Sequence, residues 1–183
     1  MRRLALVTIG ALTCACTSTA TSPSGSRAST ASTALAANAT VVHIDDGDTI
    51  DVDIDGVRTR VRLVGIDTPE TKKPNTPVQC YGREASAYTA SLLPLGTAVR
   101  LERDAEPRDP YDRLLAYVYR AGDGLFVNLE LARGGYARVL SIKPNVAHAA
   151  DFDTAVADAR TARRGLWGTC SAFGVPASLG SAP

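Results

Sequence analysis

Residues 48–66, DTIDVDIDGVRTRVRLVGI, contain the pattern that decides the fold. Apolar and polar residues alternate on both sides of Asp55-Gly56, a pair typical of a tight β-hairpin turn. The apolar positions are Ile50, Val52, Ile54, Val57, Val61 and Leu63. A period of two places such residues on one face of a strand. The stretch therefore predicts two antiparallel strands joined at residues 55–56.

The same stretch begins like the calcium-binding loop of an EF-hand. Oxygen-bearing side chains occur at every second position and a glycine follows, but the position of the closing glutamate is Arg62. An EF-hand also requires a helix on each side of its loop, and strand alternation excludes those helices here. We therefore interpret Asp51 and Asp53 as residues on the solvent face of a strand, and Asp55 as part of its turn.

The chain on either side of this hairpin changes between strand patterns and helical patterns. Strands are predicted at residues 40–44, 98–103, 113–120 and 136–140, and helices at 81–93, 125–135 and 146–165. Pro94 follows the first helix and Gly165 ends the last. Strands with helices inserted among them indicate an α+β fold, which we expect to be a small β-barrel with helices.

The composition fits one globular domain. The chain has 183 residues, 45% of them hydrophobic, which is enough for one core. Residues 1–39 contain three arginines and no acidic residue, which leaves seventeen basic and nineteen acidic residues in 40–183. This balance excludes nucleic-acid binding through bulk charge, so any phosphate chemistry must come from a local site.

The N-terminus is typical of an export signal, which we assign to residues 1–16. Arg2 and Arg3 precede LALVTIGALTCA, an apolar stretch too short to span a bilayer. One outcome is a lipoprotein facing outward from the cell membrane, with Cys16 as the lipidated first residue. Cleavage after Ala36 would instead release a secreted protein, and a cytoplasmic chain with an apolar start is the third alternative.

Three further segments follow the signal. Residues 17–39 are rich in Ser, Thr and Ala and lack apolar periodicity, so we expect a flexible tether. The folded domain is expected over residues 40–170, with a loose tail over 171–183.

The cysteines indicate a disulfide in an oxidising compartment. Lipidation of Cys16 would remove Cys14 with the signal and leave Cys80 and Cys170, which export would favour as a disulfide. Two separate buried thiols are the alternative. These cysteines lack the spacing and the histidine partners of a zinc site.

Three motifs carry the chemistry: DDGDT at 45–49, RLVGIDTPET at 62–71 and DPYDRLLAYVY at 109–119. In order and spacing they resemble the staphylococcal nuclease family, and the resemblance extends from about Thr40 to Trp167. It implies a five-stranded OB-type barrel with three helices. It also implies a Ca²⁺ site at Asp48, Asp67 and the Thr68 carbonyl, with Asp46 as a possible outer ligand, and oxygen-only ligation suits that ion.

The resemblance assigns catalytic roles as well. Glu70 matches the family's general base, Arg62 and Arg113 match its phosphate-binding arginines, and Tyr111 matches a tyrosine that contacts a terminal phosphate. Taken singly, each of these residues could be an ordinary turn, cap or surface residue. The substrate groove departs from the family, because Pro110 replaces a lysine and 141–142 (Ser-Ile) replace two tyrosines.

The resemblance thus implies an exported, calcium-dependent endonuclease that hydrolyses DNA and RNA to 3′-phosphate products. We expect a monomer that prefers single-stranded substrates. The first alternative is an OB-type module that binds nucleic acid or an envelope partner without cutting. The second is an envelope lipoprotein in which Ca²⁺ serves stability only.

Overall fold

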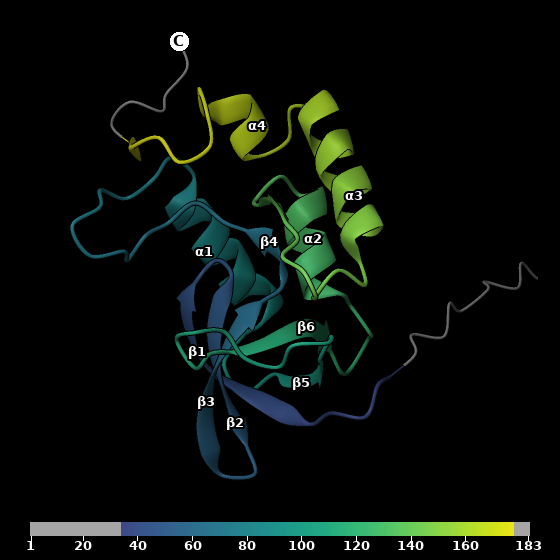
Figure 1. Cartoon of the computed structure of the whole chain (residues 1–183). Coiled ribbons are helices and arrows are strands. Elements are labelled where there is room, and N and C mark those ends of the chain that lie inside the picture. The colour runs from purple at the N-terminus through teal and green to yellow at the C-terminus, as the bar shows by residue number, and fades with distance from the viewer. Residues whose placement is uncertain (1–33, 178–183) are drawn as a thin grey trace, which may run out of the picture. The chain divides into compact units, whose positions relative to one another are not determined.

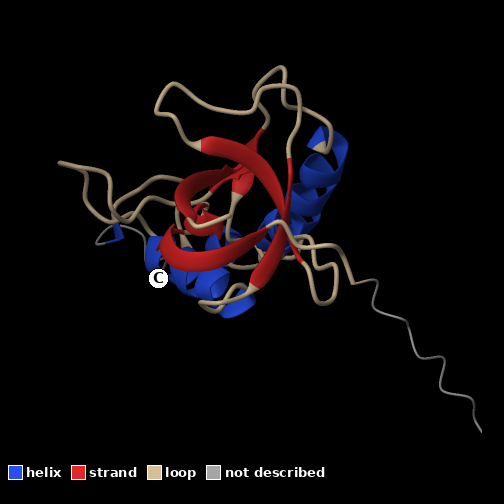
Figure 2. Ribbon diagram, turned by 90° about the horizontal axis from the view of Figure 1, so that it is seen from below, coloured by secondary structure: helices blue, strands red, loops and turns tan. Residues whose placement is uncertain are grey.

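A closed five-stranded barrel forms the centre of the domain. The computed structural model describes residues 34–177, and its barrel strands are neighbours in the order β1-β2-β3-β6-β5. They are β1 (Ala39–Asp46), β2 (Thr49–Ile54), β3 (Val57–Leu63), β5 (Ala98–Glu102) and β6 (Leu114–Arg120). Figure 2 shows these strands curving around a common interior. The predicted barrel is confirmed, whereas the signal, Cys16 and most of the tether lie outside the described residues.

The predicted hairpin joins β2 and β3. Ile54 pairs with Val57 across the turn, and Asp55 and Gly56 have φ of 52° and 84°. Positive φ at both central residues is the geometry of the turns that match strand twist. The barrel is completed by the parallel pair β3–β6 and closes through the antiparallel pair β1–β5.

A second, two-stranded sheet lies outside the barrel. It pairs β4 (Gly65–Asp67) with β7 (Arg138–Leu140), so the strand predicted within 136–140 is confirmed but does not enter the barrel. Gly65 has φ +83°, and a Cβ there would lie 2.1 Å from Cε2 of Phe152. Only glycine allows this conformation with the aromatic ring packed directly on the backbone.

Three predicted helices are confirmed: α1 (Gly82–Leu92), α2 (Val127–Arg133) and α3 (Ala149–Thr161). A short unpredicted helix, α4 (Leu166–Thr169), follows Gly165. Figure 1 shows α1, α2 and α3 gathered at one end of the barrel. No helix among residues 34–177 is long and apolar enough to cross a membrane.

One continuous hydrophobic core connects the barrel with the helices. The alternating residues Ile50, Val52, Val61 and Leu63 are fully buried. The buried residues of α3 include Phe152, which belongs to the same cluster. Burial of these large side chains is the main stabilising contribution, at about 1.5–3 kcal/mol for each.

The prediction for Asp51 is wrong, because this residue is only 3% exposed. Arg60 on β3 is its partner across the hairpin and Arg58 lies two residues away on the same strand, and both guanidinium groups donate to its carboxylate, Arg58 at 2.6 Å and Arg60 at 2.8 Å. Strand alternation does place Asp51 on the outer face, but these two long side chains cover it. Burial opposes ionisation, but the two arginines outweigh it and lower the pKa of Asp51.

Cys80 and Cys170 form a disulfide, as the export hypothesis favours. Hydrogen bonds continue beyond Cys170, where Val175 accepts from the Cys80 amide and Ala177 donates to Val78. Figure 1 shows this yellow segment beside the chain that leads into α1. Residues 171–177 therefore pack against the domain and are not the loose tail that was predicted from residue 171.

Candidate active site

The predicted site residues come together in one cavity of about 610 Å³, here called the acid–arginine cavity. Of the predicted site residues its lining includes Asp46, Asp48, Arg62, Asp67, Thr68, Glu70, Tyr111 and Arg113. They come from β1, the β1–β2 turn, β3, β4 and the loops that precede α1 and β6. The three sequence motifs therefore form one site, although the first and last lie more than sixty residues apart.

Arg62 joins the two carboxylates that the resemblance assigns to a metal. Its Nη2 lies 3.1 Å from Asp48 Oδ2 and 3.2 Å from Asp67 Oδ1, and its side chain is 11% exposed. Its Nη1 donates to the carbonyls of residues 63 and 66. Arg62 occupies this position because β3 pairs it with Thr49, directly after Asp48.

Asp48 is fixed by the chain that follows β4. Its Oδ2 accepts the Thr68 amide at 2.9 Å, and its Oδ1 accepts the Thr49 hydroxyl at 3.1 Å. The preceding Gly47 packs so closely on this chain that a Cβ there would lie 2.6 Å from Thr68 Oγ1. A glycine before Asp48 thus lets the β1–β2 turn approach Thr68.

Asp67 is held from the opposite side by Arg138. The two residues are partners in the β4–β7 pair, and the guanidinium donates to Asp67 Oδ2 at 2.8 and 2.9 Å. Burial and the negative charge of Asp48 nevertheless raise the pKa of Asp67, although Arg62 and Arg138 oppose this. A carboxylate whose ionisation is disfavoured by a neighbouring acid is a suitable setting for a bound cation.

Asp46 and Glu70 share a hydrogen bond. Burial and this bond raise the pKa of Asp46 to about 7, although Thr71 donates to its carboxylate. Burial also opposes ionisation of Glu70, but the Asp46 bond and the backbone amides of Thr71 and Lys72 outweigh it and lower the pKa of Glu70. When the pair holds one proton, Asp46 therefore carries it in preference to Glu70.

Arg113 borders the acid–arginine cavity from the loop before β6. Its Nε donates to Asp109 Oδ2 at 2.6 Å, and the same carboxylate accepts the Arg113 amide. Its guanidinium lies 5.5 Å from the ring centre of Tyr111, which is 80% exposed. Asp109 thus fixes the guanidinium, and Tyr111 extends toward solvent at the mouth of the cavity.

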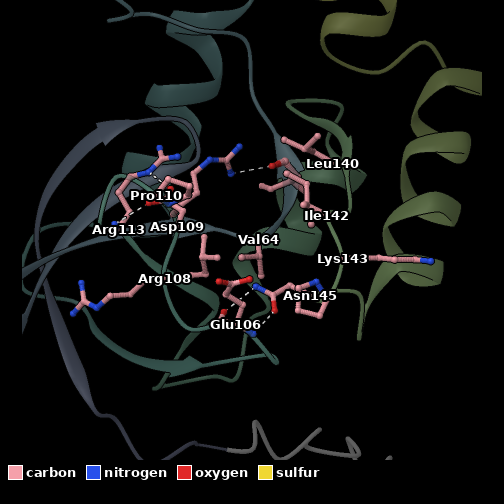
Figure 3. Close-up of a pocket in the computed structure, with 15 residues that line it drawn as sticks. Val64, Glu106, Arg108, Asp109, Pro110, Arg113, Leu140, Ile142, Lys143 and Asn145 are labelled. Carbon is pink, nitrogen blue, oxygen red and sulfur yellow. Dashed lines mark hydrogen bonds and ion pairs between the residues drawn. The ribbon is translucent and has the colours of Figure 1, made fainter.

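A second, less polar cavity of about 310 Å³, here called the side pocket, shares Arg62 and Arg113 with the first. Figure 3 shows Pro110 and Arg113 on one side of it, Leu140 and Ile142 on the other, and Val64 between them. Arg108 and Lys143 extend away from it in opposite directions (Figure 3). Ile142 and Pro110, two departures from the family's groove, therefore line this pocket.

The donors at Asp48, Asp67 and Thr68 fit a hard cation. Both carboxylates already meet at one cationic group, the guanidinium of Arg62. The Thr68 hydroxyl is buried without a hydrogen-bond partner beside them. No cluster of three or more His, Cys, Asp or Glu side chains suited to a metal occurs within residues 34–177, so Ca²⁺ would need carbonyl oxygen and water besides the two carboxylates.

Three supporting residues escaped prediction from the sequence. Asp109 lies inside the third motif and holds Arg113, so its position was a usable signal. Thr71 directly follows Glu70 and donates to Asp46. Arg138 gave no local signal, because its contact with Asp67 depends on the pairing of β4 with β7.

A barrel of this topology, with paired carboxylates and two arginines in one cavity, defines an OB-type domain suited to a phosphate and a cation. The chain matches the family model "Staphylococcal nuclease homologue" over residues 60–169. It is 47% identical over 113 residues to the thermonuclease of Staphylococcus intermedius, and the aligned region covers 62% of this chain and 66% of that protein. It is 41% identical over 115 residues to endonuclease YncB of Bacillus subtilis, and the aligned region covers 62% of this chain and 53% of that protein.

The chain belongs to the staphylococcal nuclease family. The thermonuclease of Staphylococcus hyicus is similar as well, at 42% identity over 113 residues, with 65% of that protein covered. The matched region thus spans just under two thirds of each thermonuclease and about half of YncB. Family membership agrees with the fold that the three motifs implied.

Proposed function

We propose that this protein is a calcium-dependent endonuclease that hydrolyses the phosphodiester bonds of DNA and RNA and leaves 3′-phosphates. One observation carries the proposal: the acid–arginine cavity brings together two carboxylates joined by one arginine, a second arginine and a further glutamate. The similar proteins are a thermonuclease and an endonuclease, which supports the same reaction class.

The two arginines suit a phosphate. Arg62 approaches from β3 and Arg113 from the loop before β6, so the scissile phosphate would lie between their guanidinium groups. Charge that develops on the phosphoryl oxygens is stabilised by donors that are already in place. Asp109 orients Arg113, and the carbonyls of residues 63 and 66 orient Arg62.

Glu70 is the proposed general base. It would take a proton from water, whose oxygen bonds to phosphorus while the bond from phosphorus to O5′ breaks, and the departing O5′ would take up a proton from solvent to become the 5′-hydroxyl. The Gln79 side chain accepts from the Glu70 amide at 2.8 Å, which fixes the backbone at this residue. Asp48, Asp67 and the Thr68 carbonyl would hold Ca²⁺, with Asp46 outside them, and the bound ion would stabilise negative charge on the phosphate.

The side pocket supports a preference for unpaired nucleotides. It adjoins both arginines, and its wall of Leu140, Ile142 and Pro110 offers apolar contact to a base that has left a stack. An aliphatic side chain gives less stacking energy than an aromatic one, which contributes about 1–3 kcal/mol per base. We therefore expect weak base selectivity, with Tyr111 free to contact a terminal phosphate.

Two substitutions test the mechanism: Glu70→Gln removes the base and Arg62→Ala removes a phosphate donor. Each should lower turnover on denatured DNA by at least a hundredfold while circular dichroism stays unchanged. Arg133→Ala, on the exposed face of α2, is the matched control and should keep full activity. Wild-type turnover in both site variants would disprove the assigned roles.

Calcium dependence is tested with the same substrate in Ca²⁺ and then in EGTA. Cutting that stops in EGTA and returns with Ca²⁺ supports the nuclease. Binding of denatured DNA without cutting would support a binding module, and a calcium-raised melting temperature with neither binding nor cutting would support a structural ion.

We further propose that the protein acts outside the cytoplasm as a monomer. The disulfide between Cys80 and Cys170 is the observation that favours export. Mass spectrometry of the protein from its own cell envelope would distinguish a lipid on Cys16 from cleavage after Ala36. Light scattering would test the monomer.

A further inference from the structure

The acid–arginine cavity has a second group of cations, here called the cation wall, that the proposed reaction does not use. It consists of Arg60 on β3 and of Lys72 and Lys73 in the loop after Glu70. All three line the same cavity as Arg62 and Arg113. They differ from those arginines in exposure, since the side chains of Arg60 and Lys72 are 48% and 53% exposed.

Asp45 forms ion pairs with two members of the cation wall, Arg60 and Lys72. Its Oδ1 lies 3.1 Å from Lys72 Nζ, and its Oδ2 lies 3.7 Å from Arg60 Nη1. This carboxylate is 25% exposed and directly precedes Asp46. One acid at the end of β1 therefore gathers cations from a barrel strand and from the loop that contains the proposed base.

Asp51 orients Arg60 from the other side. It binds Nε of Arg60 at 2.8 Å and shares its charge with Arg58, so Nη1 of Arg60 remains directed at Asp45. The cation wall carries three positive charges, and the carboxylates that pair with it are Asp45 and Asp51. The wall therefore exceeds its paired carboxylates by one positive charge at the edge of the cavity.

We propose that Arg60 and Lys72 form a second phosphate subsite, which binds a phosphate next to the scissile one in a polynucleotide strand. The inference rests on the proposed nuclease function and extends it to the substrate class: chains of several nucleotides rather than single esters. A phosphodiester oxyanion matches two exposed donors that a single acid holds together. A single strand presents one such anion at every nucleotide, so the strand that enters between Arg62 and Arg113 supplies it.

The subsite also predicts how Asp45 tunes binding. In the free protein Asp45 neutralises part of the charge of both cations, and an incoming phosphate replaces it as their partner. Asp45→Asn should therefore strengthen binding of a strand, whereas loss of the cations should weaken it. A general loss of structure would weaken strand binding in all of these variants, so it would not explain opposite changes in affinity.

The test compares the double variant Arg60→Gln/Lys72→Gln with the wild type on two substrates. One is denatured DNA over a range of salt concentrations, and the other is a nucleoside 5′-(p-nitrophenyl) phosphate, which has one phosphate. The ratio of kcat/KM on DNA to kcat/KM on the single ester should fall about tenfold at low salt, through KM. The slope of log(kcat/KM) on DNA against log[salt] should become shallower by about 1 to 2.

The matched control is Arg100→Gln/Arg133→Gln, which removes two exposed, paired arginines that do not line the cavity. It should keep the wild-type ratio and slope. An unchanged ratio and salt slope in Arg60→Gln/Lys72→Gln would overturn the subsite, as would equal losses on both substrates. A wild-type protein that cuts neither substrate would instead overturn the proposed nuclease function, and the subsite with it.

Discussion

Reduction of the disulfide should remove a large part of the stability of this domain. Cys80 and Cys170 are 90 residues apart, so the bond closes most of the folded chain into one loop. In the chain-entropy relation a loop of this length restricts the unfolded state by about 4.6 kcal/mol at 25 °C. Since domains are stable by about 5–15 kcal/mol in all, the reduced protein should approach the limit of stability.

Urea unfolding of the oxidised and reduced protein measures this effect. The fluorescence of Trp167, the single tryptophan, reports on α4 next to Cys170. A loss of about 4.6 kcal/mol corresponds to a midpoint lower by about 2 M, for a slope of about 2 kcal/mol/M. Amide exchange at Ala177, which donates to Val78, should accelerate on reduction as well.

The double variant Cys80→Ala/Cys170→Ala is the control for the reductant itself. It should unfold near the reduced wild-type midpoint, with and without reductant. Coinciding midpoints for oxidised and reduced wild type would refute the reasoning, because they would mean that this bond does not restrict the unfolded chain.

Two further predictions concern stability. Gly65→Ala should lower the free energy of unfolding by about 2–4 kcal/mol in urea titrations, since its Cβ would meet the Phe152 ring at 2.1 Å. Gly56 has nearly the same φ as Gly65 but lies in open space, so Gly56→Ala should lower the free energy of unfolding only by the backbone contribution of about 1–2 kcal/mol. Equal losses of stability in the two variants would contradict the steric argument. The Ala147 amide and the Tyr117 hydroxyl, which donate to Asp104, lower its pKa below 3.8 despite burial. Its contribution to stability is therefore full above pH 4 and is lost as the pH falls through the lowered pKa, so Asp104→Asn should weaken the acid dependence of the melting temperature below pH 4. Equal acid dependence in both proteins would disprove that contribution.

Much of the barrel could be predicted because its signals are local. The alternation around Asp55-Gly56 specifies a hairpin from neighbouring residues alone, and the structure has both residues at positive φ. The pairing of β4 with β7 was not predicted, because the three residues of β4 show no usable period and the paired residues are more than seventy positions apart. Helix α4 was missed for the same reason, since one turn has no periodicity.

The candidate site could be predicted as a set of residues but not as a set of contacts. The resemblance of the three motifs to the staphylococcal nuclease family named residues that the structure places in the lining of the acid–arginine cavity. The exposure of Asp51 was predicted wrongly, because alternation gives the face of a strand and not what covers it. The coverage comes from the side chains of Arg58 and Arg60 on the next strand.

By itself the sequence determined the α+β class and the hairpin, because these depend on short-range periodicity. The candidate site residues came from the resemblance of its three motifs to the staphylococcal nuclease family. Only the tertiary structure decided which groups meet: Arg62 between Asp48 and Asp67, and Arg138 on Asp67 across 71 residues of chain. Charge pairing acts over a few ångströms in space. Residues far apart in the sequence come within that distance only when the barrel has closed, so their pairing cannot be inferred from their separation along the chain.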